Sequence, residues 1–342
     1  MYNKPMSKIK VGVLRGGPSG EYDISLKTGA TVLKNLSHPK FEDKYHLYDI
    51  YIAKDGMWHM HGAPVTPTQV AQQVDVFFNA LHGAYGEDGK VQKILDDHHA
   101  RYTGSGALGS AVGMNKALAK DLFKIHSIKT PYHIVLENKD REVERDPSLL
   151  GRHALTIFRS FPMPAVVKPA SAGSSLGISI VRDFQSIEPA LAEAFRHDDT
   201  VVVEEFIAGA EATVGIVENF RGEELYVLPP IEIRHRREFF DYDAKYSDNR
   251  AVSAEEIVPG NFTSEQKEEL ARLAREVHRA LGLRHYSRTD FIVSPRRGVY
   301  VLEVNTLPGL TEASLVPKAV DAIGSNLPDF LDHLVMLAHE GK

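Results

Sequence analysis

SRTD at residues 287–290 and EVN at residues 303–305 are the two short segments that say most about the fold and chemistry of this sequence. Asp290 interrupts an apolar run, and Glu303 and Asn305 end a second apolar run that follows it. Both runs have the composition of buried strands, so we expect two adjacent strands joined by the turn at residues 294–298. Because alternate residues of a strand face the same side, this hairpin brings the three side chains together.

The side chains gathered by this hairpin are oxygen donors of the kind that Mg²⁺ binds, with waters and substrate phosphates completing its shell. We therefore predict that Asp290, Glu303 and Asn305 are metal ligands. Arg288 shares the face of Asp290, and a cation beside a metal site indicates that negative charge is stabilised there during a reaction. A solvated hairpin with scattered charges is the alternative. It is weaker, because the acids interrupt strands that otherwise have a buried composition.

The composition is that of a globular protein with two or three domains. The 342 residues are 43% hydrophobic and 25% charged, which is ordinary for such proteins. A net charge of -6, from 40 basic and 46 acidic residues, gives no electrostatic basis for nucleic-acid binding. The lack of cysteine excludes disulfides, thiol catalysis and cysteine zinc sites, and it favours a cytoplasmic protein. No apolar run approaches the ~18 residues of a membrane span, so we expect neither membrane insertion nor a signal peptide.

The first part of the chain alternates between expected strands and expected helices. Strands are predicted at residues 9–14, 46–53 and 74–81, and helices at residues 22–36 and 91–98. This alternation predicts an α/β domain with a parallel sheet and helical crossovers. The segment at residues 102–106 leads into an expected helix at residues 107–123, so we end the first domain at residue 104.

The rest of the chain predicts two further lobes, at residues 105–205 and 206–342. Strands are expected at residues 165–168, 178–181, 201–205, 211–218 and 225–233, and helices at residues 147–158 and 328–339. Thr263 and Gln266 have the spacing of a capping box, and apolar residues recur at helical spacing after them. Residues 235–259 form a long polar loop of a kind that often covers a site as a lid.

A loop of small residues follows the expected strand that ends at Lys168. Such loops bring backbone N–H groups close to phosphate oxygens, and the lysine can add a positive charge. A mobile hairpin turn explains this segment equally well when it is taken alone. The loop also contains GSSLG, but a serine-hydrolase elbow is excluded because the chain runs on into a strand and not into a helix. No P-loop motif occurs.

Two loops of the first domain each place a candidate side chain after a strand. GGPSGE at residues 16–21 is not a dinucleotide fingerprint, and its Glu21 either complements a helix dipole or faces a ligand. LHGAYGEDG at residues 81–89 places His82 at the end of a strand, whereas Glu87 and Asp88 are expected to begin the next helix. The histidines at positions 59 and 61 lack a third ligand at metal spacing, so we expect them to be surface histidines.

Together these segments resemble the D-alanine–D-alanine ligase family of the ATP-grasp superfamily. The resemblance covers residues 16–317 and rests on segments in the expected order: GGPSGE, LHGAYGEDG, YTGSGALGSAVGMNK, VVKPASAGSSLGIS, EEFIAGAE, FDYDAKY, SRTDF and LEVNTLPGLTEASLVP. It implies a parallel-sheet N-terminal α/β domain followed by a two-lobed ATP-grasp fold. The implied reaction joins two D-alanines through an acylphosphate at the expense of ATP, for peptidoglycan precursor synthesis.

The resemblance also implies the residues that hold ATP and metal. Lys116, Lys168 and Lys245 match lysines that contact the phosphates, and Glu211 matches the ribose ligand. The residues implied at the adenine, some of them through backbone groups, are Glu204, Glu205, Phe206 and Ile207. The expected metal trio matches the ligands of two Mg²⁺ ions, for which Mn²⁺ can substitute.

The amino-acid substrates are assigned in the same way. Glu21 matches the acid that holds the ammonium group of the first D-alanine, and His82 matches a substrate-site histidine. The hydrogen-bonded partners of this acid, which also close the lid, are Ser174 and Tyr246. Arg288 and the backbone N–H of Gly309 match the oxyanion site. The carboxylate of the second D-alanine is implied to meet Ser314 and Leu315.

Two other functions stay open at this point. One is a related carboxylate–amine ligase that uses D-serine, D-lactate or another acid, although Tyr246 favours a peptide product over the D-lactate ester. The other is a catalytically silent ATP-binding protein, which no feature of the sequence supports. Members of the family are commonly homodimers, and we expect the same here.

Overall fold

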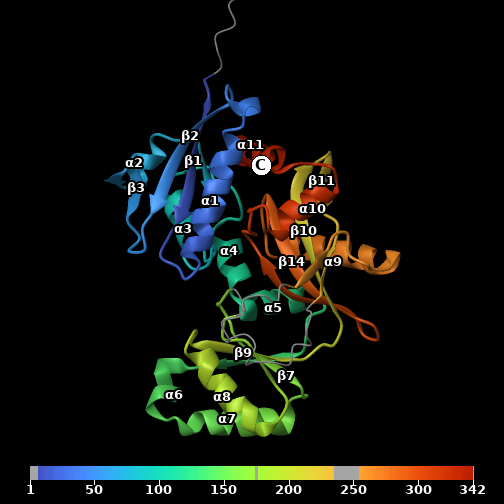
Figure 1. Cartoon of the computed structure of the whole chain (residues 1–342). Helices are drawn as coiled ribbons and strands as arrows, with labels where there is room; N and C mark the ends of the chain where they lie inside the picture. Colours follow the sequence, from blue (N-terminus) through green and yellow to red (C-terminus); the bar gives the residue numbers. More distant parts are fainter. Residues whose placement is uncertain (1–6, 174–175, 235–253, 342) are drawn as a thin grey trace, which may run out of the picture.

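The computed structural model of the chain describes residues 7–173, 176–234 and 254–341 (Figure 1). Its described strands form three sheets, and each sheet takes its strands from one continuous part of the sequence. The first sheet and helix α1 lie at one end of Figure 1, and the second sheet with its helices lies at the other end. The fold is the mixed α/β architecture with several sheets that the sequence predicts.

The first sheet has the strand order β4-β3-β2-β1-β5. Its strands are β1 (Ile9–Gly16), β2 (Tyr45–Ile52), β3 (Trp58–Met60), β4 (Ala63–Val65) and β5 (Val76–Asn79). Pairing of β1 with β2 and with β5 is parallel, as predicted, whereas β3 and β4 extend the sheet in the antiparallel sense. The helices of this part are α1 (Tyr22–Leu36), α2 (Pro67–Ala71) and α3 (Lys90–Asp97), with a 3₁₀ turn at Pro39–Phe41.

Gly16 controls how the chain leaves the first sheet. Its φ angle is +91°, and a Cβ atom at this position would lie 2.3 Å from the carbonyl oxygen of Ile52. Only glycine combines this backbone conformation with so close an approach to β2. The loop that carries Glu21 therefore begins at the carboxyl end of β1.

The second sheet is antiparallel and has the order β6-β9-β7-β8. Its strands are β6 (His133–Glu137), β7 (Ala165–Pro169), β8 (Ser179–Val181) and β9 (Thr200–Glu205). The strands expected at residues 165–168 and 178–181 are present as β7 and β8, and they pair in the antiparallel sense. One face is covered by α7 (Ser148–Ser160) and α8 (Phe184–Phe195), preceded by a 3₁₀ turn at Lys139–Arg141 and by α6 (Glu142–Arg145) (Figure 1). Neither β6 nor α8 is predicted by the sequence patterns above.

The third sheet carries the hairpin from which the sequence interpretation began. Its order is β13-β12-β10-β14-β15, with β11 also paired to β10. The strands are β10 (Ala210–Phe220), β11 (Glu223–Val227), β12 (Ile231–Arg234), β13 (Glu255–Ile257), β14 (Tyr286–Ser294) and β15 (Gly298–Asn305). The strand expected at residues 225–233 is thus two strands, and β13 lies inside the segment expected to be only a polar loop.

Helix α9 (Ser264–Ala280) packs on the third sheet and begins as its capping box predicts. Gln266 N donates to Thr263 Oγ1 at 3.3 Å, and Thr263 N donates to Gln266 Oε1 at 2.9 Å. These two bonds satisfy backbone donors that the first turn of a helix leaves unpaired.

The expectation of one helix at residues 107–123 is wrong. The structure has α4 (Ala107–Met114) and α5 (Lys116–Ile125), separated by Asn115 in an extended conformation. The Asn115 side chain accepts a hydrogen bond from Leu118 N at 3.1 Å, which caps α5. Asparagine is a strong N-cap, so it starts a new helix here instead of continuing the first one.

Two helices at the end of the chain connect the third sheet to the first. They are α10 (Leu315–Ala322) and α11 (Leu327–Glu340). Phe330 and Leu334 of α11 share one buried core with Val32 of α1 and Phe78 of β5. The first and last parts of the chain therefore pack as one unit.

We propose that the chain divides at residues 104 and 205, as expected from the sequence, because each segment supplies the strands of one sheet. The helices cross this division, since Ala119 and Phe123 of α5 are buried in the core of the third sheet. Within the described ranges, no helix has both the length and the apolar character needed to cross a bilayer.

Phe330 tests the core that joins the ends of the chain. It is fully buried, and its ring lies 6.2 Å from that of Tyr286 and 6.4 Å from that of Phe220. We expect Phe330→Ala to lower the free energy of unfolding by about 3–5 kcal/mol, because it removes buried contacts and leaves a cavity. Phe158, which is 46% exposed, supplies the control variant Phe158→Ala. If urea unfolding shows that both variants lose the same free energy of unfolding, the assignment of Phe330 to this core is wrong.

Candidate functional site

The register of β14 and β15 brings the expected metal ligands together. Asp290 pairs with Glu303 across the two strands, and Arg288 pairs with Asn305. The expectation that a hairpin gathers these side chains is confirmed. The register shifts immediately after Asp290, so the strands are irregular at the site itself.

The carboxylate of Asp290 accepts hydrogen bonds on both oxygens. Arg288 donates from Nε to Oδ1 at 3.0 Å and from Nη2 to Oδ2 at 2.9 Å. Thr213, opposite on β10, donates to Oδ1 at 2.5 Å. Burial lowers the pKa of Arg288, but the Asp290 carboxylate more than offsets this and the pKa is raised. Arg288 is therefore a permanent cation next to the expected metal ligands.

Lys116 connects Glu303 to the loop that follows β7. Its Nζ donates to the carbonyl of Ala172 at 2.8 Å and lies 3.4 Å from Glu303 Oε2. Its backbone N–H donates to the carbonyl of Ala170 at 2.8 Å. Burial raises the pKa of Glu303, but the charges of Lys116 and Lys168 offset this and lower it. The first turn of α5 is thus fixed against the small-residue loop.

Lys168 and Glu204 form a buried ion pair between β7 and β9, with Lys168 Nζ 2.8 Å from Glu204 Oε1. A second lysine, Lys120 of α5, lies 3.0 Å from the same oxygen. Burial raises the pKa of Glu204, yet the charges of Lys120 and Lys168 outweigh burial and lower the pKa to about 2. The two lysines therefore keep Glu204 ionised at neutral pH.

The other residues expected at the nucleotide lie at the end of β9 and on β10. Glu205 accepts from Arg297 at 2.8 and 3.1 Å and from Tyr132 N at 3.0 Å. Phe206 N donates to the carbonyl of Pro164 at 3.0 Å, and Ile207 is buried. Glu211 lies near the start of β10, opposite Ile292 of β14. These residues lie where the chain passes from the end of β9 in the second sheet to the start of β10 in the third sheet.

Glu21, His82 and Glu87 form a compact group at the carboxyl end of the first sheet. Their ligand-type atoms all lie within 4.8 Å of one another. His82 Nδ1 lies 3.4 Å from Glu87 Oε1, and its Nε2 lies 2.9 Å from Thr28 Oγ1. A Cβ atom at Gly173 would lie 2.8 Å from Glu21 Oε1, so the small-residue loop of the second sheet meets this group.

Ser314 and Leu315 lie at the N-terminus of α10, where unpaired backbone N–H groups favour an anion. The Ser314 hydroxyl bonds to Thr311, with Thr311 N donating at 3.1 Å and the two hydroxyl oxygens 2.8 Å apart. A Cβ atom at Gly309 would lie 2.8 Å from Ser314 Oγ, which places Gly309 against the same helix start. Three expected site residues are thus neighbours. Ser174, Lys245 and Tyr246 lie outside the described residues.

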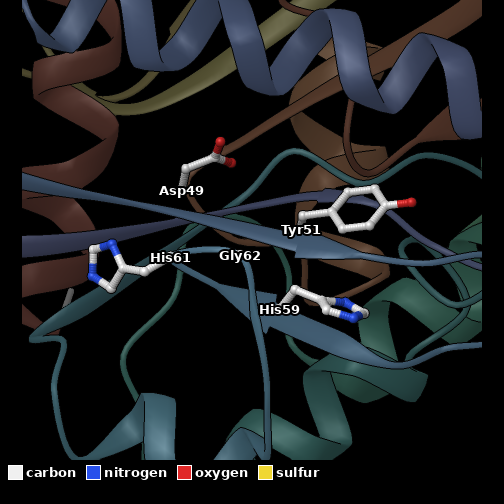
Figure 2. Close-up of a pocket in the computed structure, with 5 residues that line it drawn as sticks. All are labelled: Asp49, Tyr51, His59, His61 and Gly62. Carbon is white, nitrogen blue, oxygen red and sulfur yellow. The ribbon is translucent and has the colours of Figure 1, made fainter.

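A surface pocket on the first domain is separate from this site. Asp49, Tyr51, His59, His61 and Gly62 line it (Figure 2). The two histidine rings point away from each other in Figure 2, and Asp49 is held by Arg15 at 2.5 and 2.6 Å. This agrees with the interpretation of these histidines as surface residues.

Comparisons with known proteins identify the family. Models described as "D-ala D-ala ligase C-terminus" and "D-ala D-ala ligase N-terminus" match residues 122–336 and 62–105. The D-alanine–D-alanine ligase of Geotalea uraniireducens (strain Rf4) is 38% identical, covering 96% of this chain and 95% of the relative. The chain belongs to the D-alanine–D-alanine ligase family. A second relative of the same name, from Pelotomaculum thermopropionicum, is 37% identical over 97% of both chains.

Solved structures agree with this family. The D-Ala:D-Ser ligase VanG of Enterococcus faecalis superposes with a TM-score of 0.83 at 28% identity, covering 97% of this chain and 99% of the other. D-alanyl-alanine synthetase A of Vibrio cholerae O1 gives a TM-score of 0.81 at 26% identity, covering 98% and 99%. The family therefore confirms the ATP-grasp fold expected from the sequence.

Three neighbours of the site were not assigned a role in it by sequence reasoning. Glu87 does not begin a helix, because α3 starts at Lys90 and Glu87 instead accepts from Gly83 N at 2.9 Å. Thr213 has no motif around it, and its role follows only from its pairing opposite Asp290. Lys120 lies one helical turn after Lys116. Residues four apart share a face of a helix, so this spacing could have indicated that Lys120 lies near the same site.

The donor set of the hairpin fits a hard divalent cation. Asp290 Oδ2 accepts only from Arg288 among the hydrogen bonds described above, which leaves acceptor capacity for a metal. Asn305 Oδ1 accepts one bond, from Leu307 N at 2.9 Å, and Glu303 is only partly buried. Two carboxylates and one amide oxygen match the preference of Mg²⁺.

The low pKa of Glu204 predicts a pH-dependent contribution to stability. A carboxylate whose pKa falls from 4.5 to about 2 on folding stabilises the native state above pH 4.5. That stabilisation is lost as the pH falls from 4.5 towards 2. We expect unfolding free energies of Glu204→Gln, measured in urea over this range, to fall less steeply with acid than those of the native sequence. If the unfolding free energies of the variant and of the native sequence fall with the same slope as the pH is lowered, Glu204 is not ionised as described.

Proposed function

We propose that the chain joins two molecules of D-alanine into D-alanyl-D-alanine, with ATP converted to ADP and phosphate. The observation that carries this proposal is that Asp290, Glu303 and Lys116 lie close together beside the small-residue loop. A relative named D-alanine–D-alanine ligase matches 96% of this chain. Acidic metal ligands and a phosphate-facing lysine at one place are suited to phosphoryl transfer.

In the first half of the reaction, the carboxylate of the first D-alanine attacks the γ-phosphorus of ATP. The bond from that phosphorus to the bridging oxygen breaks, ADP leaves, and an acylphosphate remains. Lys116 and Lys168 border the loop at residues 169–173 and supply positive charge to the phosphates. Asp290, Glu303 and Asn305 would hold Mg²⁺, which would neutralise charge on the transferring group.

The first D-alanine is oriented by the group at the carboxyl end of the first sheet. The Glu21 carboxylate accepts hydrogen bonds from the ammonium group of this substrate, and His82 lies beside Glu21. Thr28 and Glu87 hold the two ring nitrogens of His82, so the imidazole keeps one orientation. The substrate carboxylate then points towards the lysines and the metal ligands.

In the second half, the amine of the second D-alanine attacks the acyl carbon, and the tetrahedral intermediate expels phosphate. Arg288 and the N–H of Gly309 stabilise the oxyanion. Ser314 and the start of α10 receive the carboxylate of the second D-alanine. Exclusion of water from the acylphosphate is proposed for the segment at residues 235–259. The resemblance implies Ser174 of the small-residue loop and Tyr246 of this segment as partners of Glu21, and both lie outside the described residues.

The identity of the second substrate is the point at which related ligases differ. Curated relatives at 37–38% identity are named D-alanine–D-alanine ligases, whereas the D-Ala:D-Ser ligase VanG shares 28%. D-Alanine is therefore the favoured second substrate. Phosphate release with D-alanine alone, compared with mixtures containing D-serine or D-lactate, tests this choice, and a faster reaction with either mixture would overturn it.

We also propose a cytoplasmic homodimer that uses two Mg²⁺ ions, with Mn²⁺ as a substitute. The cytoplasm supplies ATP, and the donor set described above suits both metals. Light scattering on the purified chain gives the oligomeric state, and a monomer mass at micromolar concentration would contradict the dimer.

Glu303 tests the metal site. We expect Glu303→Gln to abolish dipeptide synthesis, because the neutral amide weakens metal binding beside the transferring phosphate, while circular dichroism stays unchanged. Excess chelator should abolish synthesis by the native chain, and either Mg²⁺ or Mn²⁺ should restore it. Normal turnover in the variant, or in chelator, would disprove the assignment.

Arg288 tests the oxyanion site. We expect Arg288→Ala to reduce kcat by about 10²–10³-fold, the usual effect of losing one such donor, with ATP affinity nearly retained. Steady-state kinetics with each substrate varied in turn separate the two parameters. A change confined to the KM for ATP would make Arg288 a nucleotide contact instead.

A further inference from the structure

Lys120 is a completely buried lysine for which the proposed reaction has no role. Its side chain is 0% exposed, and its Nζ donates to Thr130 Oγ1 at 2.6 Å. The same Nζ lies 3.0 Å from Glu204 Oε1. A buried ammonium group is costly unless it is paired, so this position calls for an explanation.

Lys120 shares its carboxylate with Lys168. Glu204 Oε1 lies 2.8 Å from Lys168 Nζ, and the Glu204 side chain is 3% exposed. Both contacts have ion-pair distances, but neither meets hydrogen-bond geometry at Oε1. Two cations therefore share one anion, and the charge of Glu303 also acts on both lysines.

The two lysines differ in what they can reach. Lys168 is the last residue but one of β7 and borders the small-residue loop, where the nucleotide phosphates are proposed to bind. Lys120 lies inside α5, held between Thr130 and Glu204, with no exposed surface. Only Lys168 can move from Glu204 to a phosphate.

Moving Lys168 leaves the charge of Glu204 to be balanced by another group. An uncompensated buried carboxylate is strongly unfavourable. Lys120 already lies at ion-pair distance and stays there when Lys168 departs. His133, opposite Glu204 on β6, is a further titratable group in this region. Burial lowers the pKa of both side chains, to about 8 for Lys120, where Glu204 opposes the shift, and below 6.5 for His133, which disfavours the cationic form of the histidine.

We propose that Lys120 is a positioning residue for nucleotide binding, which stays with Glu204 as its counter-ion and thereby frees Lys168 to contact the phosphates of ATP. This inference rests on the nucleotide-binding part of the proposed function. Lys116 and Lys120 lie one turn apart on α5, so one helix serves both the phosphate loop and the carboxylate at the end of β9.

The test compares four full-length chains: the native sequence, Lys120→Met, Glu204→Gln and the double variant. Methionine has a similar length and no charge. Lys124→Met, at an exposed position in the last turn of the same helix, controls for the loss of one positive charge from α5. Calorimetry with Mg²⁺–ADP gives nucleotide affinity, and steady-state kinetics give the KM values for ATP and D-alanine.

We expect Lys120→Met to raise the Kd for Mg²⁺–ADP and the KM for ATP by about tenfold, within the range for charged neighbours that are coupled. The KM for D-alanine and the Lys124→Met control should stay within about twofold of the native values. In the Glu204→Gln background the lysine has no carboxylate to balance, so its replacement should have no further effect on ADP affinity.

Additive losses would overturn the inference, because Lys120 would then act independently of Glu204. Equal increases in the KM for ATP and for D-alanine would also overturn it, since a general structural defect has that effect. If Lys120→Met does not fold, the comparison of Glu204→Gln with the double variant still decides the question. Failure of the native chain to make dipeptide would refute the ligase proposal. The calorimetric measurement of Mg²⁺–ADP affinity needs no D-alanine, so it tests the role of Lys120 separately.

Discussion

Asp290 lies opposite Glu303 because β14 and β15 pair in one antiparallel register, and the neighbouring β10 places Thr213 opposite Asp290. A slip of one residue in either pairing would turn these side chains to the other face of the sheet. The buried positions of β14, such as Phe291 and Val293, hold the register by packing into the core under α9. The positions of the acids thus depend on hydrophobic residues that alternate with them.

Partly buried carboxylates are unfavourable unless they are paired, and here lysines from other elements pair with them. Lys116 reaches Glu303 from α5, and Lys168 with Lys120 balances Glu204 from two sides. These lysines are paired with carboxylates. In the proposed function, substrate phosphates would meet positive charge that is already positioned, and they would compete with protein acids for it.

The first domain is held in place by contacts at its connection to the rest of the chain. Gly104 N donates to the ring of His285 at 3.0 Å, and Arg284 N donates to Ser105 Oγ at 3.2 Å, just before β14 begins. Helix α11 packs against α1 in the same core. These contacts set Glu21 and His82 at a fixed position relative to the hairpin of β14 and β15, which a two-substrate reaction requires.

The sequence by itself determined the strand hairpin, the capped helix α9, the parallel pairing around β1 and the residue types at the site, because these depend on local patterns of apolar, glycine and capping residues. Short strands such as β6 and β13 lacked such a pattern. Only the tertiary structure decided that Glu87 faces His82, that Lys120 faces Glu204 and that α5 packs on the third sheet. A buried charge is recognisable only through its partner, and that partner lies far away in the sequence.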